Sequence, residues 1–272
     1  MMGLNILVFI NIKIKILMEL QNIPKITYVI AYQHKPDRLL NLRRVLEWLQ
    51  PFQGLEVIIV EQDKKSKISE LNLRAKHIFI KSDLPFNKSW AFNVATRYVT
   101  TPIIIFGDSD LIMHPQSFIQ AVQQLDFYDC VNPYNSVVDL TPQESLLDLN
   151  SILQINRIGR GEAADDIQKV PLCGGIIMFK KEKLYEIGGW TEAFYGWGAE
   201  DDMQSLKVKS FLTHTTLMNR CYHLYHEKAQ IDMKLYQRNL ELLNHFTNAT
   251  KEQLKQHINM VNGKIGKLNL HS

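Results

Sequence analysis

Three carboxylates stand side by side at Glu200, Asp201 and Asp202, directly behind a stretch of aromatic residues and glycines that ends near Gly198. Adjacent carboxylates repel one another, so folding alone gives little reason to collect them there. A ligand-binding site does give one, because aromatic faces contact a ligand, glycines allow close approach and a carboxylate can accept a proton. The structural alternative is the acidic first turn of a helix that starts near Asp202, which the helix dipole would favour.

A second carboxylate pair, Asp108 and Asp110, follows an apolar run that ends in Phe106 and Gly107. Carboxylates at positions i and i+2 can direct one side chain at a divalent cation and the other at a neighbouring polar ligand. Hard cations take oxygen ligands and commonly keep substrate phosphates in their coordination shell. Asp-x-Asp triplets also occur in ordinary turns, and it is the place at the end of a buried strand that favours a metal site here.

Two late histidines, His223 and His226, are candidate metal ligands. At this spacing both imidazoles can reach one ion, from an extended stretch or from a helical turn. The alternative is a pair of packed or surface side chains beside Tyr222 and Tyr225. Mixed Asp and His ligation suits Mn²⁺ better than Mg²⁺, because imidazole is a softer ligand than carboxylate or water. The sequence therefore predicts a Mn²⁺ site, with Mg²⁺ as the alternative ion.

Composition sets broad limits on the function. The 272 residues are 46% hydrophobic, enough for one large or two modest domains, and the net charge of +3 indicates no nucleic-acid partner. Cys130, Cys173 and Cys221 lack CxxC spacing and fit free thiols in a reducing compartment. The apolar residues 4–12 are too few for a membrane-spanning helix and no signal-peptide cleavage site follows them, so we expect a cytoplasmic protein.

The remaining elements must place these side chains together. Continuous apolar runs predict strands at residues 26–32, 55–60, 77–80 and 102–106. Helical spacing of apolar positions predicts helices from Pro36, over 90–99, from Pro115, over 181–187, from 202 to about 209, over 231–246 and over 253–261. Strands that are apolar on both sides and alternate with helices predict an α/β protein with a mainly parallel sheet flanked by helices. Such sheets bind ligands at the carboxyl edge of their strands, where Gln33, Glu61 and Asp108 fall.

Four segments resemble, in order, the beta-1,4-galactosyltransferase family and related bacterial family 2-type glycosyltransferases of the GT-A fold. They are IIVEQD at 58–63, FNKSWAFNV at 86–94, FGDSDLI at 106–112, and the run from the glycine pair at 174–175 to GWGAEDD at 196–202. The likeness spans roughly residues 25–228. It implies the GT-A fold, followed here by C-terminal helices.

The resemblance also implies roles for the matching residues. Asp110 and His226 would bind the metal, and so would His223, which stands where vertebrate members have Met. Asp201 would be the general base, with Glu200 beside it on the acceptor hydroxyls. The other implied substrate-binding residues are Asp108 at the ribose or metal shell of a nucleotide sugar, Trp197 over the sugars, and Gly175, Leu172, Asp202, Gln33, Glu61, Lys88 and Asn93.

Two departures from the family pattern bear on the donor. An Arg that the family carries near the first strand is replaced by Gln33, so Lys35, Arg38 or Lys88 would have to take its place near the nucleotide. Leu172 stands where galactose-transferring members often have Tyr. The smaller side chain leaves space for a 2-acetamido group and favours an N-acetylgalactosamine donor.

Together these features predict a metal-dependent, inverting glycosyltransferase that moves galactose or N-acetylgalactosamine from a UDP-sugar to a glycan or lipid-linked saccharide acceptor. We expect it to act in bacterial surface polysaccharide or capsule synthesis, in the cytoplasm or in peripheral association with the inner face of the membrane. The expected organisation is an N-terminal extension (1–23), a catalytic domain (24–230) and a C-terminal helical extension (231–272). The charged, glycine-containing residues 157–162 are expected to form a mobile loop that closes over the donor.

Two alternatives stay open on the sequence. A sugar nucleotidyltransferase also uses metal-binding carboxylates on an α/β domain, although residues 31–39 lack the glycine-rich phosphate loop that it would ordinarily carry. A non-catalytic glycan-binding protein could keep the same fold, because a fold alone does not fix a function.

Overall fold

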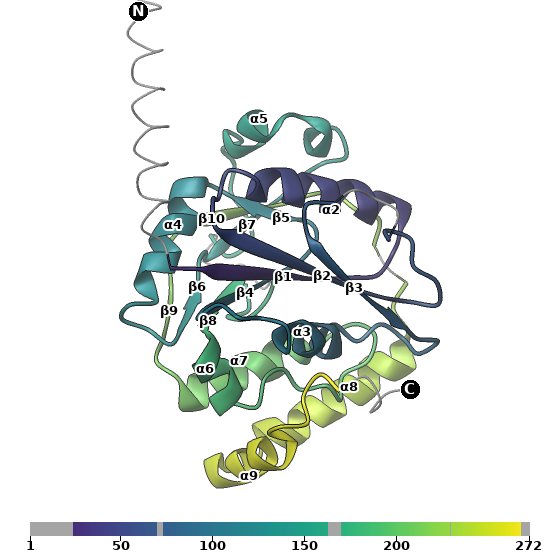
Figure 1. Ribbon diagram of the computed structural model, residues 1–272, viewed down its shortest axis with the longest axis vertical. Coiled ribbons are helices and arrows are strands. Elements are labelled where there is room, and N and C mark those ends of the chain that lie inside the picture. Colours follow the sequence, from purple (N-terminus) through teal and green to yellow (C-terminus); the bar gives the residue numbers. More distant parts are fainter. Residues whose placement is uncertain (1–23, 70–72, 163–169, 229, 268–272) are drawn as a thin grey trace, which may run out of the picture.

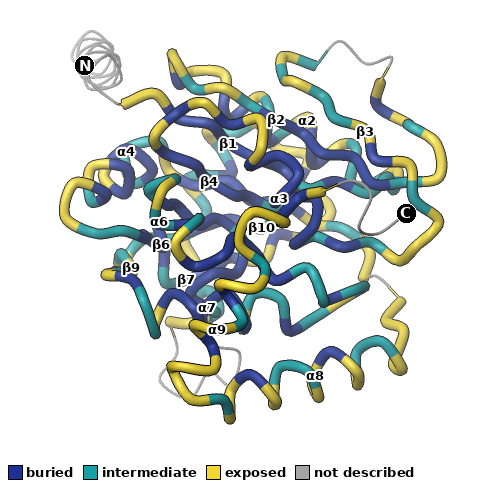
Figure 2. The backbone as a smooth tube through the Cα atoms, turned by 60° about the horizontal axis from the view of Figure 1, so that its bottom comes forward, coloured by how far each residue is buried: buried dark blue, intermediate teal, exposed yellow. Residues whose placement is uncertain are grey.

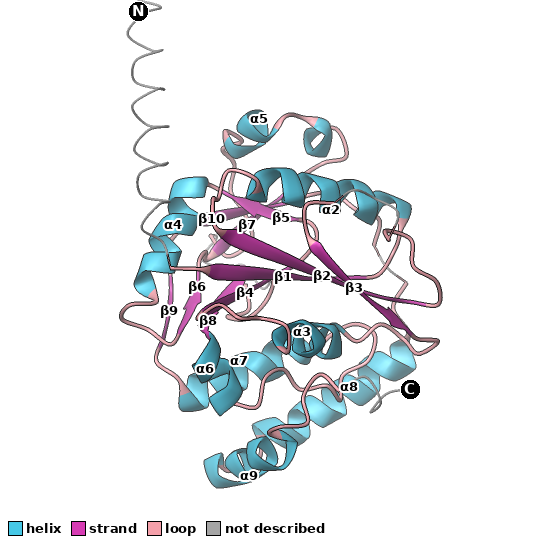
Figure 3. Cartoon of the chain, in the orientation of Figure 1, coloured by secondary structure: helices cyan, strands magenta, loops and turns pink. Residues whose placement is uncertain are grey.

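The computed structural model describes residues 24–69, 73–162, 170–228 and 230–267, and the predicted N-terminal extension lies outside them. These residues form one large and one small sheet with flanking helices (Figures 1 and 3). The strands are β1 (Ile26–Tyr32), β2 (Leu55–Asp63), β3 (Lys76–Lys81), β4 (Ile103–Gly107), β5 (Leu111–Met113), β6 (Cys130–Asn132), β7 (Ser136–Asp139), β8 (Ile177–Lys180), β9 (His214–Thr216) and β10 (Arg220–His223). The helices are α2 (Pro36–Leu49), α3 (Lys88–Thr96), α4 (Pro115–Gln124), the 3₁₀ turn η1 (Glu144–Leu146), α5 (Leu149–Leu153), α6 (Lys181–Glu186), α7 (Glu200–Phe211), α8 (Met233–Thr247) and α9 (Lys251–Val261).

The large sheet has the strand order β3-β2-β1-β4-β8-β6-β9. The pairs β3–β2, β2–β1 and β1–β4 are all parallel. β8 is antiparallel to both β4 and β6, and β9 is parallel to β6. The four strands predicted from apolar runs are β1 to β4. The mainly parallel central sheet is therefore confirmed.

Both faces of the large sheet are buried at its central strands β1 and β4, which explains why these two strands are almost wholly apolar. Along β1, Tyr28 and Ile30 pack into the core beneath α2 and α4, and Val29 between them packs into the core on the side of α3 and α7. Figure 1 shows these helices on opposite sides of the sheet, and Figure 2 shows the strands buried between them. Alternate side chains of one strand thus serve two separate cores.

Helices α3 and α7 both begin two residues earlier than the sequence pattern predicted. Asn87 caps α3 by accepting the backbone N–H of Trp90 on its Oδ1 at 2.8 Å. Helix α7 begins at Glu200, directly after Ala199, whose φ of +74° is left-handed. The acidic triplet therefore fills the first turn of α7, as the structural alternative proposed, and the helix dipole favours carboxylates there.

The small sheet has the order β5-β10-β7 and was not predicted. β10 lies antiparallel to β5 and parallel to β7, and its register sets His223 opposite Leu111 on one side and opposite Asp139 on the other. Its strands are only three or four residues long, too short for a recognisable alternation of apolar and polar residues. This sheet nevertheless positions part of the candidate site.

The two predicted C-terminal amphipathic helices are present as α8 and α9, and they lie together beside α7 (Figure 1). Phe246 of α8 shares a small apolar core with Met203 of α7. The proposed division of the chain at residue 231 stays a prediction. Within the described part of the chain, we find no helix whose length and hydropathy would let it cross a bilayer.

Candidate active site

Asp110, His223 and His226 come together where β5 begins and β10 ends. The backbone holds the two segments in place, because the N–H of Leu224 donates to the carbonyl of Asp110 at 2.8 Å. Nε2 of His226 lies 3.4 Å from Oδ2 of Asp110, and Nε2 of His223 lies 3.8 Å from Oδ1. One ligand atom from each of the three side chains lies within 4.8 Å of the others.

This donor set fits a divalent ion of the Mn²⁺ type, because it combines a carboxylate with two imidazoles. Ligand atoms bound at about 2.1 Å are at most about 4.2 Å apart, so small side-chain rotations would close the set. Nδ1 of His223 lies 2.8 Å from Oδ1 of Asp139, and Nδ1 of His226 lies 2.9 Å from the carbonyl oxygen of Glu227. Both partners can only accept, so each Nδ1 is the donor, and each Nε2 is the ring nitrogen that faces Asp110 and would bind an ion.

A second cluster surrounds Lys88 at the start of α3. Its Nζ lies 2.8 Å from Oδ1 of Asp201, 3.1 Å from Oε1 of Glu200 and 3.8 Å from Oδ1 of Asp108. The two aspartates of the turn after β4 therefore face different clusters, Asp110 toward the histidines and Asp108 toward Lys88. The ammonium group thus joins the acidic triplet to the Asp-x-Asp turn.

Burial and charge shift the pKa values in this second cluster. Burial raises the pKa of Asp201 to about 8, an effect that Lys88 opposes and the charges of Glu200 and Asp108 reinforce. Burial likewise raises the pKa of Asp108, again against the influence of Lys88. Burial alone would lower the pKa of Lys88, but the surrounding carboxylates hold it well above its usual range. A carboxylate that takes up protons near neutral pH suits a general base.

The glycine pair of the sequence lies against Asp201. A Cβ on Gly174 would lie 2.4 Å from the Pro171 ring and 3.5 Å from Oδ2 of Asp201. Gly175 has a φ of +79°, and its Cβ would lie 2.2 Å from the hydroxyl of Tyr134. That hydroxyl donates to the carbonyl of Gly174 at 2.6 Å. Larger residues would displace this backbone from its position beside the carboxylate.

An exposed aromatic ring stands three residues before the acidic triplet. Trp197 is 57% exposed, and its ring centroid lies 5.4 Å from that of Tyr236 on α8. Asn239 on the same helix donates its Nδ2 to the carbonyls of Tyr195 at 2.8 Å and Gly198 at 3.2 Å. Helix α8 thus braces the loop that carries the tryptophan, and this loop leads directly into the acidic triplet.

Glu61 belongs to neither cluster. This buried residue accepts hydrogen bonds on Oε2 from the hydroxyl of Ser66 at 2.6 Å and on Oε1 from the N–H of Lys67 at 2.7 Å. Nε2 of His77 lies 3.0 Å from the same Oε2. Because the protein itself occupies both oxygens, the geometry assigns Glu61 to holding the loop after β2.

Asn93 also serves the loops rather than facing the two clusters. It is buried in α3, donates to the carbonyl of Trp190 at 2.8 Å and to the carboxylate of Glu192 at 2.7 Å, and accepts from the N–H of Trp190. Asp202 lies on the exposed side of α7, and Gln33 is half-buried just after β1. The structure thus gathers seven of the predicted residues into the two clusters and leaves Glu61, Asn93, Asp202 and Gln33 outside them.

Residues 157–162 contact β7 in this structure, and their expected closure over the donor stays a prediction. Arg160 pairs through its backbone with Val137, N–H to carbonyl in both directions at 3.0 and 2.8 Å. Its Nε lies 2.7 Å from Oδ2 of Asp139. Residues 163–169, which continue the predicted loop, lie outside the described residues.

Asp139 and Tyr236 touch the site although neither was predicted. Asp139 contacts His223 across 84 positions of sequence, and no motif surrounds it. Tyr236 lies in a helix that the apolar pattern did predict, but that pattern does not reveal the ring beside Trp197. Only the pairing of β7 with β10 and the packing of α8 bring these residues to the site.

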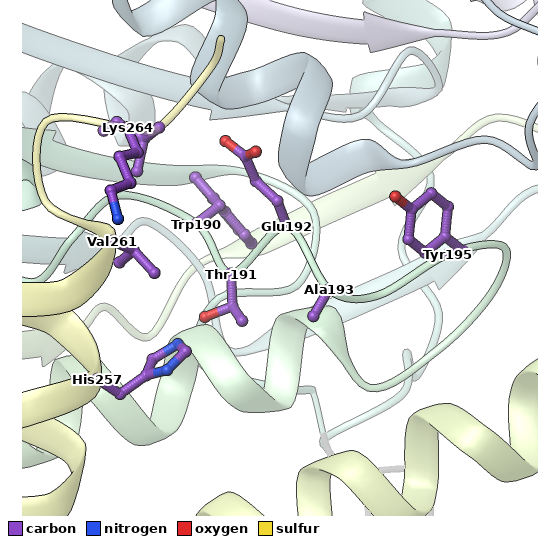
Figure 4. Close-up of a pocket in the computed structure, with 9 residues that line it drawn as sticks. Trp190, Thr191, Glu192, Ala193, Tyr195, His257, Val261 and Lys264 are labelled. Atoms are coloured by element: carbon purple, nitrogen blue, oxygen red, sulfur yellow. The ribbon is translucent and has the colours of Figure 1, made fainter. Parts of the chain in front are cut away.

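Two cavities lie apart from the clusters. The first, of about 340 Å³, is lined by the loop from Trp190 to Tyr195 and by His257, Val261 and Lys264 (Figure 4). The second, of about 520 Å³, is lined by residues of α2 and β2 and by Leu73 and Arg74. None of the predicted site residues lines either cavity.

A comparison with models of protein families shows which family the chain belongs to. The model of glycosyl transferase family 2 matches residues 28–188, more than half of the chain. The chain belongs to glycosyl transferase family 2. A second model, described as the N-terminal domain of galactosyltransferase, matches residues 167–227 and covers the glycine pair, the acidic triplet and both histidines. A search of curated proteins finds no match.

Two solved structures share the fold of this family 2 chain. Staphylococcus aureus TarS superposes with a TM-score of 0.55 at 14% identity, over 90% of this chain and 44% of that one. A structure of GalNAc-T7 with UDP, GalNAc and Mn²⁺ gives a TM-score of 0.53 at 14% identity, over 81% and 48%. The chain therefore spans less than half the length of either protein, and at this identity the likeness shows the fold alone. The predicted GT-A fold is confirmed.

The family assignment agrees with the predicted enzyme class, that of the glycosyltransferases. It favours glycosyl transfer over both alternatives left open by the sequence, nucleotidyl transfer and glycan binding without catalysis.

Proposed function

We propose that this glycosyltransferase transfers galactose or N-acetylgalactosamine from a UDP-sugar to a hydroxyl of a glycan acceptor, with inversion and with a bound divalent cation. Mn²⁺ is the favoured ion and Mg²⁺ the alternative. The observation that carries the proposal is the position of Lys88, whose Nζ lies 2.8 Å from Asp201 and 3.8 Å from Asp108. It joins the candidate base to the turn that also carries the metal ligand Asp110.

On the donor side, Asp110, His223 and His226 hold the cation, and Asp108 contacts the ribose or the metal shell. When bound, the cation neutralises the negative charge that builds on the diphosphate leaving group. The structure of GalNAc-T7 was solved with UDP, GalNAc and Mn²⁺, which supports testing this donor and this ion first.

On the acceptor side, Asp201 accepts the proton of the attacking hydroxyl as its oxygen bonds to the anomeric carbon. The bond from that carbon to the diphosphate breaks at the same time, and UDP leaves with the electron pair. Attack from the face opposite UDP inverts the anomeric centre. Glu200 binds acceptor hydroxyls, and Trp197, with Tyr236 beside it, offers the aromatic face for the sugar ring.

The donor sugar is proposed from Leu172, which is buried beside the base-bearing helix. The next residue, Cys173, donates its N–H to Ser205 Oγ at 3.1 Å, and that hydroxyl donates to the carbonyl of Asp201 at 2.7 Å. We expect L172Y to lower the rate with UDP-N-acetylgalactosamine relative to UDP-galactose, because the larger ring fills the space for the 2-acetamido group. L172M is the matched control and should keep the wild-type preference.

The wider setting remains part of the proposal. The acceptor is a glycan or lipid-linked saccharide of a bacterial surface polysaccharide, reached in the cytoplasm or at the inner face of the membrane. The three cysteines are buried and free, which agrees with the reducing compartment expected from their spacing.

A panel of UDP-sugars with saccharide acceptors, with and without Mn²⁺, tests the proposal through released UDP. We expect UDP release with UDP-N-acetylgalactosamine or UDP-galactose that depends on Mn²⁺ and stops with EDTA. Equal release with and without the ion in the wild type would refute the metal-dependent mechanism. Turnover of a different nucleotide sugar alone would refute the donor assignment and leave the mechanism standing.

A further inference from the structure

We propose that Asp139 is a positioning residue that fixes the ring of His223 for metal binding, and that Arg160 in turn holds Asp139. This inference rests on the proposed metal-dependent function. It concerns residues that neither the sequence motifs nor the family resemblance pointed to, and it gives a role to the segment around Arg160.

The first step is the register of the small sheet. Parallel pairing of β7 with β10 sets Asp139 opposite His223, and the N–H of Leu140 donates to the carbonyl of His223 at 2.9 Å. The carboxylate of Asp139 then reaches Nδ1 of the imidazole at 2.8 Å. The contact therefore follows from backbone pairing and not from two flexible side chains that meet by chance.

The second step is the tautomer. An ionised carboxylate only accepts hydrogen bonds, so Nδ1 of His223 must be the donor, and Nε2 is the ring nitrogen left to bind an ion. Nε2 lies 3.8 Å from Oδ1 of Asp110, on the side where the ion would bind. A carboxylate behind a ligating imidazole fixes its ring orientation and raises its basicity.

The third step is the support of Asp139 itself, whose side chain is about half exposed. Nε of Arg160 lies 2.7 Å from Oδ2 of Asp139 and Nη2 lies 3.0 Å from Oδ1, the two-pronged geometry that guanidinium groups favour. The backbone pairing of Arg160 with Val137 fixes the guanidinium stem on the same sheet. Arg160 thus contacts both carboxylate oxygens of Asp139, and Oδ1 is at the same time the atom that bonds His223.

The two imidazoles are consequently supported unequally. His223 is backed by a carboxylate that is itself paired with an arginine, whereas His226 is backed by the backbone carbonyl of Glu227. A side-chain substitution can therefore weaken the support of His223 alone. Loss of such an outer contact typically lowers metal affinity about 10-fold to 100-fold.

The test measures Mn²⁺ binding to the full chain from the electron paramagnetic resonance signal of free Mn²⁺, without donor or acceptor. We expect D139A to weaken binding about 10-fold to 100-fold, and D139N to weaken it less because the amide oxygen still accepts from Nδ1. R160Q should fall between wild type and D139A. The control E162Q breaks an ion pair of the same region, with Arg220 at 2.8 Å, and should bind Mn²⁺ like wild type.

A double-mutant cycle separates positioning from general structural damage. H223M removes the ring that Asp139 is proposed to orient, so D139A should cause no further loss of Mn²⁺ affinity in that background. A loss of the same size with and without His223 would overturn the proposal, as would D139A and R160Q both binding Mn²⁺ within about 2-fold of wild type. If wild type itself fails to bind Mn²⁺, the proposed metal-dependent function fails instead, so the two failures are distinguishable.

Discussion

The two clusters of the candidate active site are built from different kinds of secondary structure. The metal cluster is the set of proposed metal ligands, Asp110, His223 and His226, and the base cluster is Lys88 with Asp108, Glu200 and the proposed base Asp201. The metal cluster lies at strand ends, where β10 pairs with β5 on one side and with β7 on the other and so fixes the side chains. Apart from Asp108, the base cluster lies at the N-termini of α3 and α7, where the helix dipole favours carboxylates.

The two clusters also differ in the charged groups that they contain. The metal cluster offers a carboxylate and two imidazole lone pairs to an ion from solution. The base cluster already contains its own cation, Lys88, and burial has raised the pKa of Asp201 to about 8. We therefore expect removal of the metal ion to disable the metal cluster, and pH to control the activity of the base cluster. The following predictions test that separation.

Substitution D110A should have the largest effect, because it removes the single carboxylate of the metal cluster. Several kcal/mol of charge stabilisation would be lost, so we expect transfer to fall about 10³-fold or more. Mn²⁺ binding should fall with it, measured beside UDP release. Full Mn²⁺-dependent activity in D110A would show that the ion binds elsewhere.

Substitution D201N should leave the metal cluster intact while removing the base. We expect kcat to fall about 10²-fold to 10⁴-fold, the usual contribution of a positioned base. Mn²⁺ affinity should stay within about 2-fold of wild type, since Asp201 belongs to the other cluster. A parallel loss of Mn²⁺ binding would contradict the separation of the two clusters.

The pH dependence of the wild type should report the base cluster. Asp201 must be unprotonated to accept a proton, so kcat/KM at saturating Mn²⁺ should rise with pH and level off above a pKa of about 8. Below that value it should fall about 10-fold per pH unit as Asp201 becomes protonated. K88M should move the rising part of the kcat/KM profile, its acidic limb, to higher pH, because the Lys88 charge lowers the pKa of Asp201.

The matched control for that shift is K88R, which keeps the positive charge. We expect its pH profile to lie close to that of wild type, although the planar guanidinium changes the contact geometry. An unshifted profile in K88M, with transfer still active, would show that another group sets the limb.

Substitution A199G should have the smallest effect and concerns the base cluster alone. The left-handed φ of +74° costs a residue with a side chain on the order of 1–2 kcal/mol, whereas glycine adopts it freely. The buried methyl group of Ala199 offsets about half of this gain, at about 0.8 kcal/mol. We therefore expect the free energy of unfolding, from denaturant titration, to change by less than about 1 kcal/mol with activity retained. A large destabilisation would mean that the methyl contact outweighs the strain.

Much of the fold could be predicted because its strands are long and apolar on both faces. β1 and β4 appear in the sequence as almost unbroken apolar runs, since cores lie on both sides of the sheet. The helices were found for a related reason, as α8 and α9 show apolar residues at helical spacing. The starts of α3 and α7 were missed by two residues, because neither the side-chain cap of Asn87 nor the left-handed backbone of Ala199 adds to an apolar period.

The site was predicted to a smaller extent. Asp108, Asp110 and the acidic triplet stood out because like charges are crowded in the sequence, and the histidines because of their spacing. Asp139 could not be found, since only the register of two short strands sets it opposite His223. Glu61 and Asn93 share their types with substrate-binding residues, but the structure shows their polar atoms bonded within the protein.

The sequence by itself determined the parallel sheet, the acidic segments and the glycines, because periodicity, charge crowding and backbone freedom are local properties of the chain. Tertiary structure alone decided which carboxylate faces which partner. Asp108 and Asp110 differ by two positions, yet one lies beside Lys88 and the other beside the histidines. The reason is that hydrogen bonds and ion pairs act over a few ångströms, and only folding brings residues more than 100 positions apart within that reach.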